Sequence, residues 1–207
     1  MTAAKFLIAD RAKRNEEFVQ LGSGDESGAV RMTLGHLDIE EMLFRYLDTV
    51  GDGSGTKTAN GNYSVTPQNF LIKPSISEGL TYAIHSLIIQ IEDAAAFDSG
   101  TYGNLAALTN GIQLYVANAS GVSVMDLLDG APIKTNGQWE RVAFEARLNP
   151  YSAVPGNLMN IRWDFTQTSS PLVIPPGWSL VARMRDNLSG LTNHSFFVMG
   201  HRHIHGG

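Results

Sequence analysis

Residues 158–166 read Leu-Met-Asn-Ile-Arg-Trp-Asp-Phe-Thr, and hydrophobic and polar side chains alternate along them. In an extended strand, successive side chains point to opposite faces. One face of this stretch would carry Met159, Ile161, Trp163 and Phe165. A period of two is typical of a strand in an antiparallel sheet that buries one face and exposes the other. The stretch therefore predicts a half-buried antiparallel strand.

The same period recurs from Tyr63 onward. Five further segments carry it: Ala83, His85, Leu87, Ile89 and Ile91; Ile112, Leu114 and Val116; Val142, Phe144 and Ala146; Trp178, Leu180, Ala182 and Met184; and Phe196 with Val198. Turn signals such as Asn136-Gly137 and Asp129-Gly130 separate these runs. About eight strands without alternating helices predict an all-β antiparallel β-sandwich. A jelly roll is the first topology expected, and an immunoglobulin-like sandwich is the second.

Residues 1–60 differ in character from residues 61–207. A dense charge cluster occupies residues 11–17, and glycine-rich joints occupy residues 22–28 and 51–55. These features predict an extended N-terminal arm with glycine hinges and a possible short helix, followed by a jelly-roll-like sandwich domain. The alternative is that residues 1–60 supply a strand or helix to the core of their own subunit.

Composition narrows the function classes. Of the 207 residues, 43% are hydrophobic and 17% are charged, which is too apolar for a disordered chain. There is no run of about 18 apolar residues, so no transmembrane helix is expected. With no cysteine, the chain has neither a disulfide framework nor a thiolate metal site. The net charge is −5 and the basic residues form no stripe, which argues against nucleic-acid binding.

The first residues carry only a short apolar patch, Phe6-Leu7-Ile8-Ala9, which Asp10 follows. This patch is too short for the apolar region of a signal peptide. We therefore expect the protein to mature in a cytoplasm.

Sequence motifs give little sign of catalysis. Asp98-Ser99-Gly100-Thr101 matches the turn of aspartic proteases, but that chemistry needs two carboxylates that share a proton, and the chain has no second copy. Asp52-Gly53-Ser54-Gly55 invites a calcium interpretation with Asp48, yet it lacks the spacing of an EF-hand. Both tracts are expected to be plain turns. We predict a protein that is not an enzyme and that has no cofactor and no small-molecule substrate.

Histidines alternate near the carboxyl end, at His201, His203 and His205. In a strand, all three imidazoles would share one face, and imidazole is a common ligand for transition metals. A solvated, frayed terminal strand is the expected state, so no metal is predicted, and these three are the candidates if one binds. His36, His85 and His194 are scattered and are expected to be surface or internally satisfied residues.

Seven segments between Gly61 and His201 carry a resemblance to virion structural proteins of tailed bacteriophages. They are residues 61–67, 91–93, 97–103, 108–112, 132–139, 161–165 and 185–191. The resemblance spans about two-thirds of the chain and includes no catalytic signature. It implies a small β-sandwich protein of the particle, which would be assembled in the host bacterial cytoplasm. The residues before Tyr63 and the histidine-rich end depart from it.

The resemblance implies a capsid decoration (cement) protein that binds the outside of the major capsid protein lattice and stabilises the head. Closed symmetry favours a homo-oligomer, and a trimer suits local threefold positions. The candidate anchors are Phe6, Leu7, Phe18, Leu37, Leu43, Phe44 and Tyr46. The alternative is a tail, collar, baseplate or fibre-adaptor component. A third possibility is a carbohydrate-binding or enzymatic jelly roll in which Trp139 or Trp178 stacks on sugars, although core positions are expected for both tryptophans.

Overall fold

The computed structural model describes residues 41–95, 97–143, 145–151, 156–166 and 170–204. These ranges contain ten strands and one short helix. The elements are β1 (Glu41–Tyr46), β2 (Gln68–Ile72), β3 (Leu80–Asp93), β4 (Gln113–Ala117), β5 (Ser123–Asp126), α1 (Asn136–Val142), β6 (Glu145–Tyr151), β7 (Gly156–Asp164), β8 (Leu172–Ile174), β9 (Ser179–Met184) and β10 (Asn193–Ile204).

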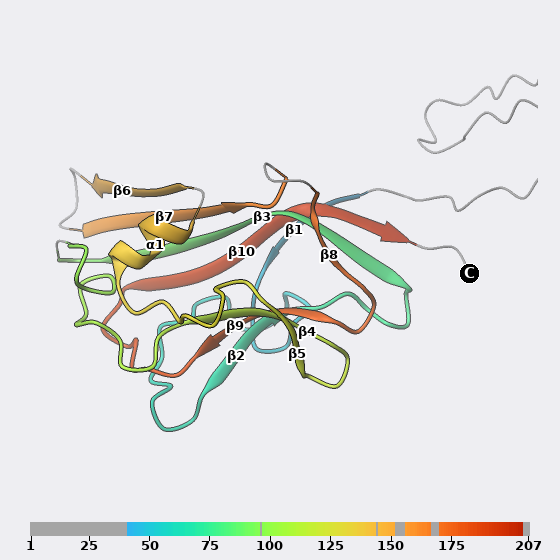
Figure 1. The fold of residues 1–207 in the computed structure, drawn as a ribbon, viewed down its shortest axis with the longest axis horizontal. Helices are drawn as coiled ribbons and strands as arrows, with labels where there is room; N and C mark the ends of the chain where they lie inside the picture. The colour runs from blue at the N-terminus through green and yellow to red at the C-terminus, as the bar shows by residue number, and fades with distance from the viewer. Residues whose placement is uncertain (1–40, 96, 144, 152–155, 167–169, 205–207) are drawn as a thin grey trace, which may run out of the picture.

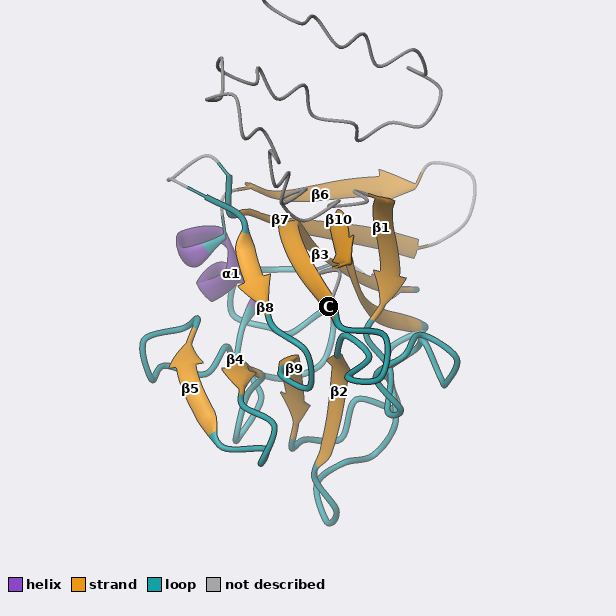
Figure 2. Ribbon diagram, turned by 90° about the vertical axis from the view of Figure 1, so that its right-hand side faces the viewer, coloured by secondary structure: helices purple, strands orange, loops and turns teal. Residues whose placement is uncertain are grey.

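The strands form two antiparallel sheets that pack face to face (Figures 1 and 2). The six-stranded sheet has the order β1-β10-β3-β7-β6, and β8 also pairs with β3. The four-stranded sheet has the order β2-β9-β4-β5. This architecture confirms the predicted all-β sandwich, whereas the jelly-roll topology stays a prediction.

The core lies between the sheets and consists of the inward residues of the alternating strands. Its fully buried side chains include Phe70, Ile72, Leu87, Ile89, Ile91, Ile112, Leu114, Ile161, Leu180, Met184, Phe196 and Val198. The inward faces predicted for β4, β7 and β9 are confirmed, because local alternation alone sets which residues share a face. Trp163, Phe165 and Trp178 are partly buried against the core.

A β-bulge changes the predicted face of β3. The pairing with β10 passes from Met199↔Ser86 to Gly200↔Ile84, so His85 has no partner of its own. One extra residue reverses the facing of the strand beyond it. Ile84 is consequently buried and His85 is half-buried, which corrects the prediction that Ala83 and His85 share the face of Leu87.

Residues 136–142 form helix α1 where alternation and the Asn136-Gly137 pair predicted a turn and a strand. The side chain of Gln138 caps the helix start, since its Oε1 accepts hydrogen bonds from the backbone N–H groups of Lys134 (2.6 Å) and Thr135 (3.1 Å). Trp139 is fully buried and meets Trp163 edge to face, with ring centroids 5.8 Å apart. Capping and this tertiary contact outweigh the short alternating pattern.

The predicted boundary of the arm at residue 60 is corrected as well. Strand β1 pairs with β10 along its whole length, from Glu41↔Arg202 to Tyr46↔Phe197. Leu47 and Ala59 are fully buried in the core. Residues 41–60 therefore belong to the sandwich of their own subunit, as the alternative interpretation held. The rest of the predicted arm, residues 1–40, lies outside the described residues.

Candidate functional site

Exposed hydrophobic side chains gather on the outer face of the six-stranded sheet, where β1 pairs with β10. We call Met42, Phe44, Tyr46, Phe197 and Met199 the β1–β10 patch. The cross-strand pairs Phe44↔Met199 and Tyr46↔Phe197 place these residues on one face. Met42 is 78% exposed and Phe44 is 53% exposed, whereas Leu43 between them is 1% exposed.

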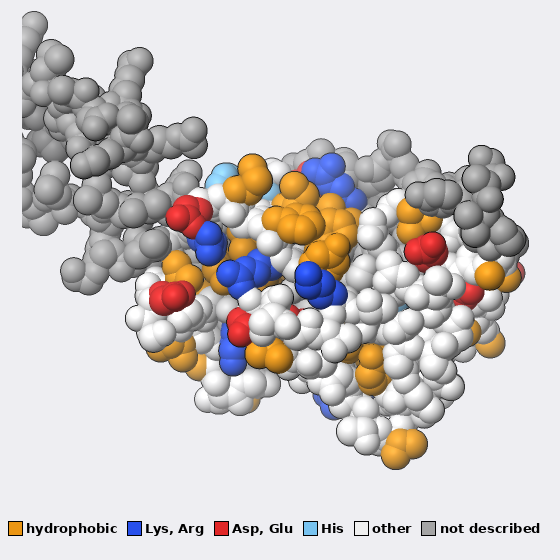
Figure 3. Space-filling model, turned by 180° about the vertical axis from the view of Figure 1, so that it is seen from behind, with side chains coloured by type: hydrophobic (Ala, Val, Ile, Leu, Met, Phe, Trp, Pro, Cys, Tyr) orange, Lys and Arg blue, Asp and Glu red, His pale blue; other side chains and the backbone are white. Residues whose placement is uncertain are grey.

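The aromatic rings of the patch pack on one another. Ring centroids lie 5.4 Å apart for Phe44 and Phe197 and 5.6 Å apart for Tyr46 and Phe197. The ammonium of Lys57 lies 5.2 Å from the centroid of the Tyr46 ring. Figure 3 shows hydrophobic side chains gathered on one face with basic side chains beside them. A contiguous exposed apolar surface with a polar rim is typical of a protein–protein contact.

The structure separates the predicted anchor residues. Phe44 and Tyr46 lie in the β1–β10 patch and are available to a partner. Leu43 faces the core, so its prediction as an interaction residue is wrong. Side chains alternate between the two faces of β1, and Leu43 lies on the inward face. Sequence reasoning did not predict this because it assigned the segment to an arm and not to a strand. Phe6, Leu7, Phe18 and Leu37 lie outside the described residues.

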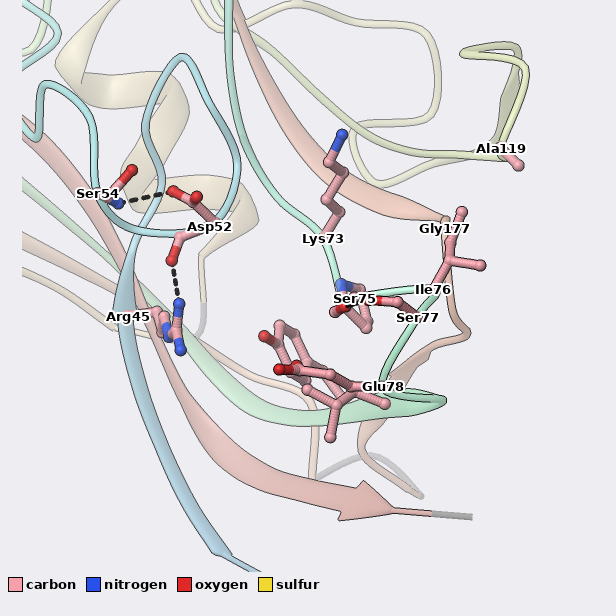
Figure 4. Close-up of a pocket in the computed structure, with 13 residues that line it drawn as sticks. Arg45, Asp52, Ser54, Lys73, Ser75, Ile76, Ser77, Glu78, Ala119 and Gly177 are labelled. Carbon is pink, nitrogen blue, oxygen red and sulfur yellow. Dashed lines mark hydrogen bonds between the residues drawn. The ribbon is translucent and has the colours of Figure 1, made fainter. Parts of the chain in front are cut away.

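A pocket of about 820 Å³ opens between the loops at residues 51–55 and 73–78. Figure 4 shows Arg45, Asp52 and Ser54 on one side of it and the segment Ser75–Glu78 on the other. The guanidinium of Arg45 donates a hydrogen bond to the backbone carbonyl of Asp52. The lining carries two basic and two acidic side chains, Arg45, Lys73, Asp52 and Glu78. Its formal charge is therefore balanced.

The titratable groups of the pocket do not form a catalytic set. Hydrogen bonds from Ser54 lower the pKa of Asp52, whose side chain is exposed. Burial raises the pKa of Tyr82, so this phenol stays neutral near pH 7. The pocket lining, all within the described residues, contains no histidine that could serve as a base near neutral pH. Sequence reasoning missed this pocket because its walls come from separate loops.

The candidate metal-binding histidines have different positions. His201 and His203 lie on β10, where both are half-buried. The Nδ1 atom of His201 lies 3.2 Å from the Nε2 atom of His85 on β3. His205 lies outside the described residues. In the described part of the chain, no three or more His, Asp or Glu side chains gather in a way that could hold a metal ion.

His194 has an entirely different environment. Its Nδ1 lies 2.8 Å from the carbonyl oxygen of Ala59, and its Nε2 lies 2.8 Å from the hydroxyl of Tyr102. A carbonyl can only accept, so Nδ1 carries the proton and Nε2 accepts from Tyr102. Burial lowers the pKa of His194 to about 4 and raises that of Tyr102. Of the two states expected for His194, on the surface or internally satisfied, the structure shows the second, and His194 joins the segment at Ala59 to β10.

The two acidic motifs are turns, as expected. The carboxylate of Asp98 accepts hydrogen bonds from the backbone N–H groups of Gly100 (2.7 Å) and Thr101 (3.1 Å). Asp48 is fully buried, and its carboxylate accepts from three backbone N–H groups, among them Val50 and Gly55 at 2.9 Å each. These bonds use the oxygens that a calcium ion would need, so Asp48 organises its own loop.

Trp139, the first candidate for sugar stacking, is fully buried beneath the six-stranded sheet and cannot contact a carbohydrate. Trp178 is partly buried against the core. These positions agree with the expected core role and remove the main support for a lectin.

Within the described ranges, no helix is long and apolar enough to cross a membrane. Comparison with known proteins finds no family model, no curated protein and no solved structure that matches this chain. The function must therefore be argued from the surface described above.

Proposed function

We propose that this chain is a non-enzymatic structural protein of a bacteriophage virion, and specifically a capsid decoration protein. It binds the outside of the major capsid protein lattice as a homo-oligomer, most simply a trimer, and stabilises the head. The observation that carries the proposal is the β1–β10 patch, an exposed apolar surface on which three aromatic rings pack against one another.

The patch has the chemistry of a docking surface. Phe44 and Met42 point away from the core and gain free energy when a partner covers them, at about 25 cal/mol per Å² of buried apolar area. The aromatic packing of Phe44, Tyr46 and Phe197 holds the patch in one conformation, which lowers the entropy cost of binding. When such modest contacts are repeated over a symmetric lattice, they stabilise the shell without any catalysed or covalent reaction.

The position of β1 adds a second argument. Strand β1 lies at the edge of its sheet and pairs only with β10 among the described strands. Residues 1–40 of the predicted arm, which lie outside the described residues, directly precede β1 in the sequence. We propose that the same capsid subunit covers the patch and is bound by the anchors in residues 1–40.

The segments that carry the resemblance to phage virion proteins contact one another in the sandwich. Tyr63 donates its backbone N–H to the carbonyl of Asp186 (3.0 Å), and the carboxylate of Asp186 accepts from the backbone N–H of Gly111 (2.7 Å). The Asn136 side chain donates to the carbonyl of Asp98 (2.8 Å). These segments thus build the loop framework of the fold in this chain.

Binding to purified empty capsid shells of the phage tests the proposal. We expect the protein to bind the shells and to raise their melting temperature. The double variant Met42→Ser/Phe44→Ser should weaken binding at least tenfold. The control Val65→Ser, at a residue that is 89% exposed outside the patch, should bind like the parent. Failure of the parent protein to bind any shell would contradict the proposal.

Copy number in purified virions separates the head from the tail. Quantitative mass spectrometry against the major capsid protein should give about one chain per capsid subunit for a lattice decoration protein. A count of a few chains to a few dozen would instead assign the protein to the tail, neck or capsid vertices. Native mass spectrometry of the free protein then tests the expected trimer.

A further inference from the structure

We propose that His85 and His201 form a two-histidine site for a divalent transition-metal ion of the zinc, nickel or copper class. The site lies on the outer face of the six-stranded sheet, at the bulge between β3 and β10. It borders the β1–β10 patch, because Met42 is the cross-strand partner of His201, but neither histidine belongs to the patch and the site does not depend on the proposed function.

The distance between the two imidazoles fits one shared metal ion. Two imidazole nitrogens that bind a tetrahedral zinc ion at about 2.0–2.1 Å lie about 3.3 Å from each other. The Nδ1 atom of His201 and the Nε2 atom of His85 are 3.2 Å apart. The ring centroids are only 4.6 Å apart, and the ring planes meet at 73°. The rings are therefore not placed end to end.

The backbone builds this arrangement. His85 is the extra residue of the β-bulge, and bulges re-aim side chains beside functional sites. Across from it, Gly200 allows β10 to approach β3 closely, since a Cβ at this position would lie 2.0 Å from the carbonyl oxygen of Ala83. The bulge and the close approach of β10 to β3 at Gly200 together bring His85 beside His201.

The chemistry of the site favours a metal with open coordination positions. Both imidazoles are half-buried, so an ion could keep water as its remaining ligands. In the free pair one nitrogen donates a proton to the other. When a metal binds, the imidazole that donated this hydrogen bond changes its tautomer and carries its proton on the ring nitrogen that does not face the metal. Metal binding by two neutral histidines therefore releases no net proton. Imidazole suits zinc, nickel and copper better than magnesium or calcium, which prefer oxygen ligands.

The strand register places further residues near the pair. His203 follows two residues later on β10, and Met42 of β1 is the cross-strand partner of His201. Across β3, Ser86 pairs with Asp164 of β7. His85 and His201 are the first two ligands of the proposed site. His85 is therefore essential for metal binding, although it lies 116 positions before His201 in the sequence.

Isothermal titration of the full chain with zinc chloride, followed by cobalt(II) absorption, tests the site. We expect one zinc ion to bind per chain. Bound cobalt(II) should give a visible absorption band that is typical of coordination with low symmetry. His85→Gln and His201→Gln should each weaken binding at least tenfold, and His203→Gln should weaken it less. Circular dichroism checks that each variant is folded.

Two results would overturn the proposal. The first is no binding of zinc or cobalt by the parent protein at millimolar concentration. The second is binding that His85→Gln leaves unchanged, because the metal would then be held by the terminal histidines alone. As a readout that needs no variant, the side-chain ¹⁵N resonances of His85 Nε2 and His201 Nδ1 should shift together when zinc is added, and their constancy would also contradict the site.

Discussion

His194 and the His85–His201 pair lie on the same strand pairing of β3 with β10, yet their environments are opposite. His194 is fully buried and neutral, and each ring nitrogen has one fixed partner. His85 and His201 are half-buried, and each imidazole faces the other at a bulge. The first histidine stabilises the fold, whereas the second two are free to exchange their mutual hydrogen bond for a ligand. Burial and partners, rather than residue type, decide which role a histidine has.

The largest effect is expected from His194→Ala. The substitution opens a cavity and leaves the Tyr102 hydroxyl and the Ala59 carbonyl without partners in the interior. We expect a loss of about 3–5 kcal/mol in the free energy of unfolding, measured by urea denaturation at pH 7.5. A loss below about 1 kcal/mol would show that His194 does not join the Ala59 segment to β10.

The pH dependence of stability should follow from the same residue. The pKa of His194 is about 4 in the folded protein, against 6.5 for an unperturbed histidine. The unfolded chain therefore binds more protons between these values, so stability is fully present above pH 6.5 and falls as the pH decreases toward 4. The expected contribution is about 3 kcal/mol over this window. Denaturation curves between pH 7.5 and 4.5 should show a steeper loss for the parent protein than for His194→Gln, and equal slopes would contradict the assignment.

Tyr102→Phe tests the second partner of His194. It removes one hydroxyl, leaves Nε2 of His194 unsatisfied and preserves the ring. We expect a loss of about 1–3 kcal/mol in the free energy of unfolding. Tyr115→Phe is the matched control, because Tyr115 is a half-buried tyrosine on β4. It should change the free energy of unfolding by less than about 0.5 kcal/mol. Equal effects of the two variants would indicate that the Tyr102 hydroxyl contributes nothing specific.

The smallest effect on folding is expected at the half-buried pair of His85 and His201. His201→Ala and His85→Ala should each alter the free energy of unfolding by about 0.5 kcal/mol or less in metal-free buffer. Thermal unfolding with and without zinc measures the second role of the pair. We expect zinc to raise the melting temperature of the parent protein and to leave the melting temperatures of both variants unchanged. A large loss in metal-free buffer would give the pair a structural role like that of His194.

The inward faces of β4, β7 and β9 could be predicted because the direction of a side chain in a strand is a local property. The bulge at His85 could not, since it requires the close approach of Gly200 from a strand more than a hundred residues away. His85 and His201 are separated by 116 positions in the chain, and no local pattern relates them. The helix at Trp139 depends similarly on a tertiary contact with Trp163. Sequence reasoning therefore found the class of fold and the histidine-rich end, but not which histidines meet.

The place of β10 has a consequence for how the protein acquires its structure. This late strand lies between β1 and β3, so it joins the earliest described strand to the central one. During synthesis on the ribosome, β1 has no partner among the described strands until β10 emerges. Pairings between such distant segments form slowly and leave unpaired strand edges exposed in the meantime. Completion of the six-stranded sheet is thus a late event, and a chain that stops before residue 193 would leave β1 without its described partner and expose one edge of β3.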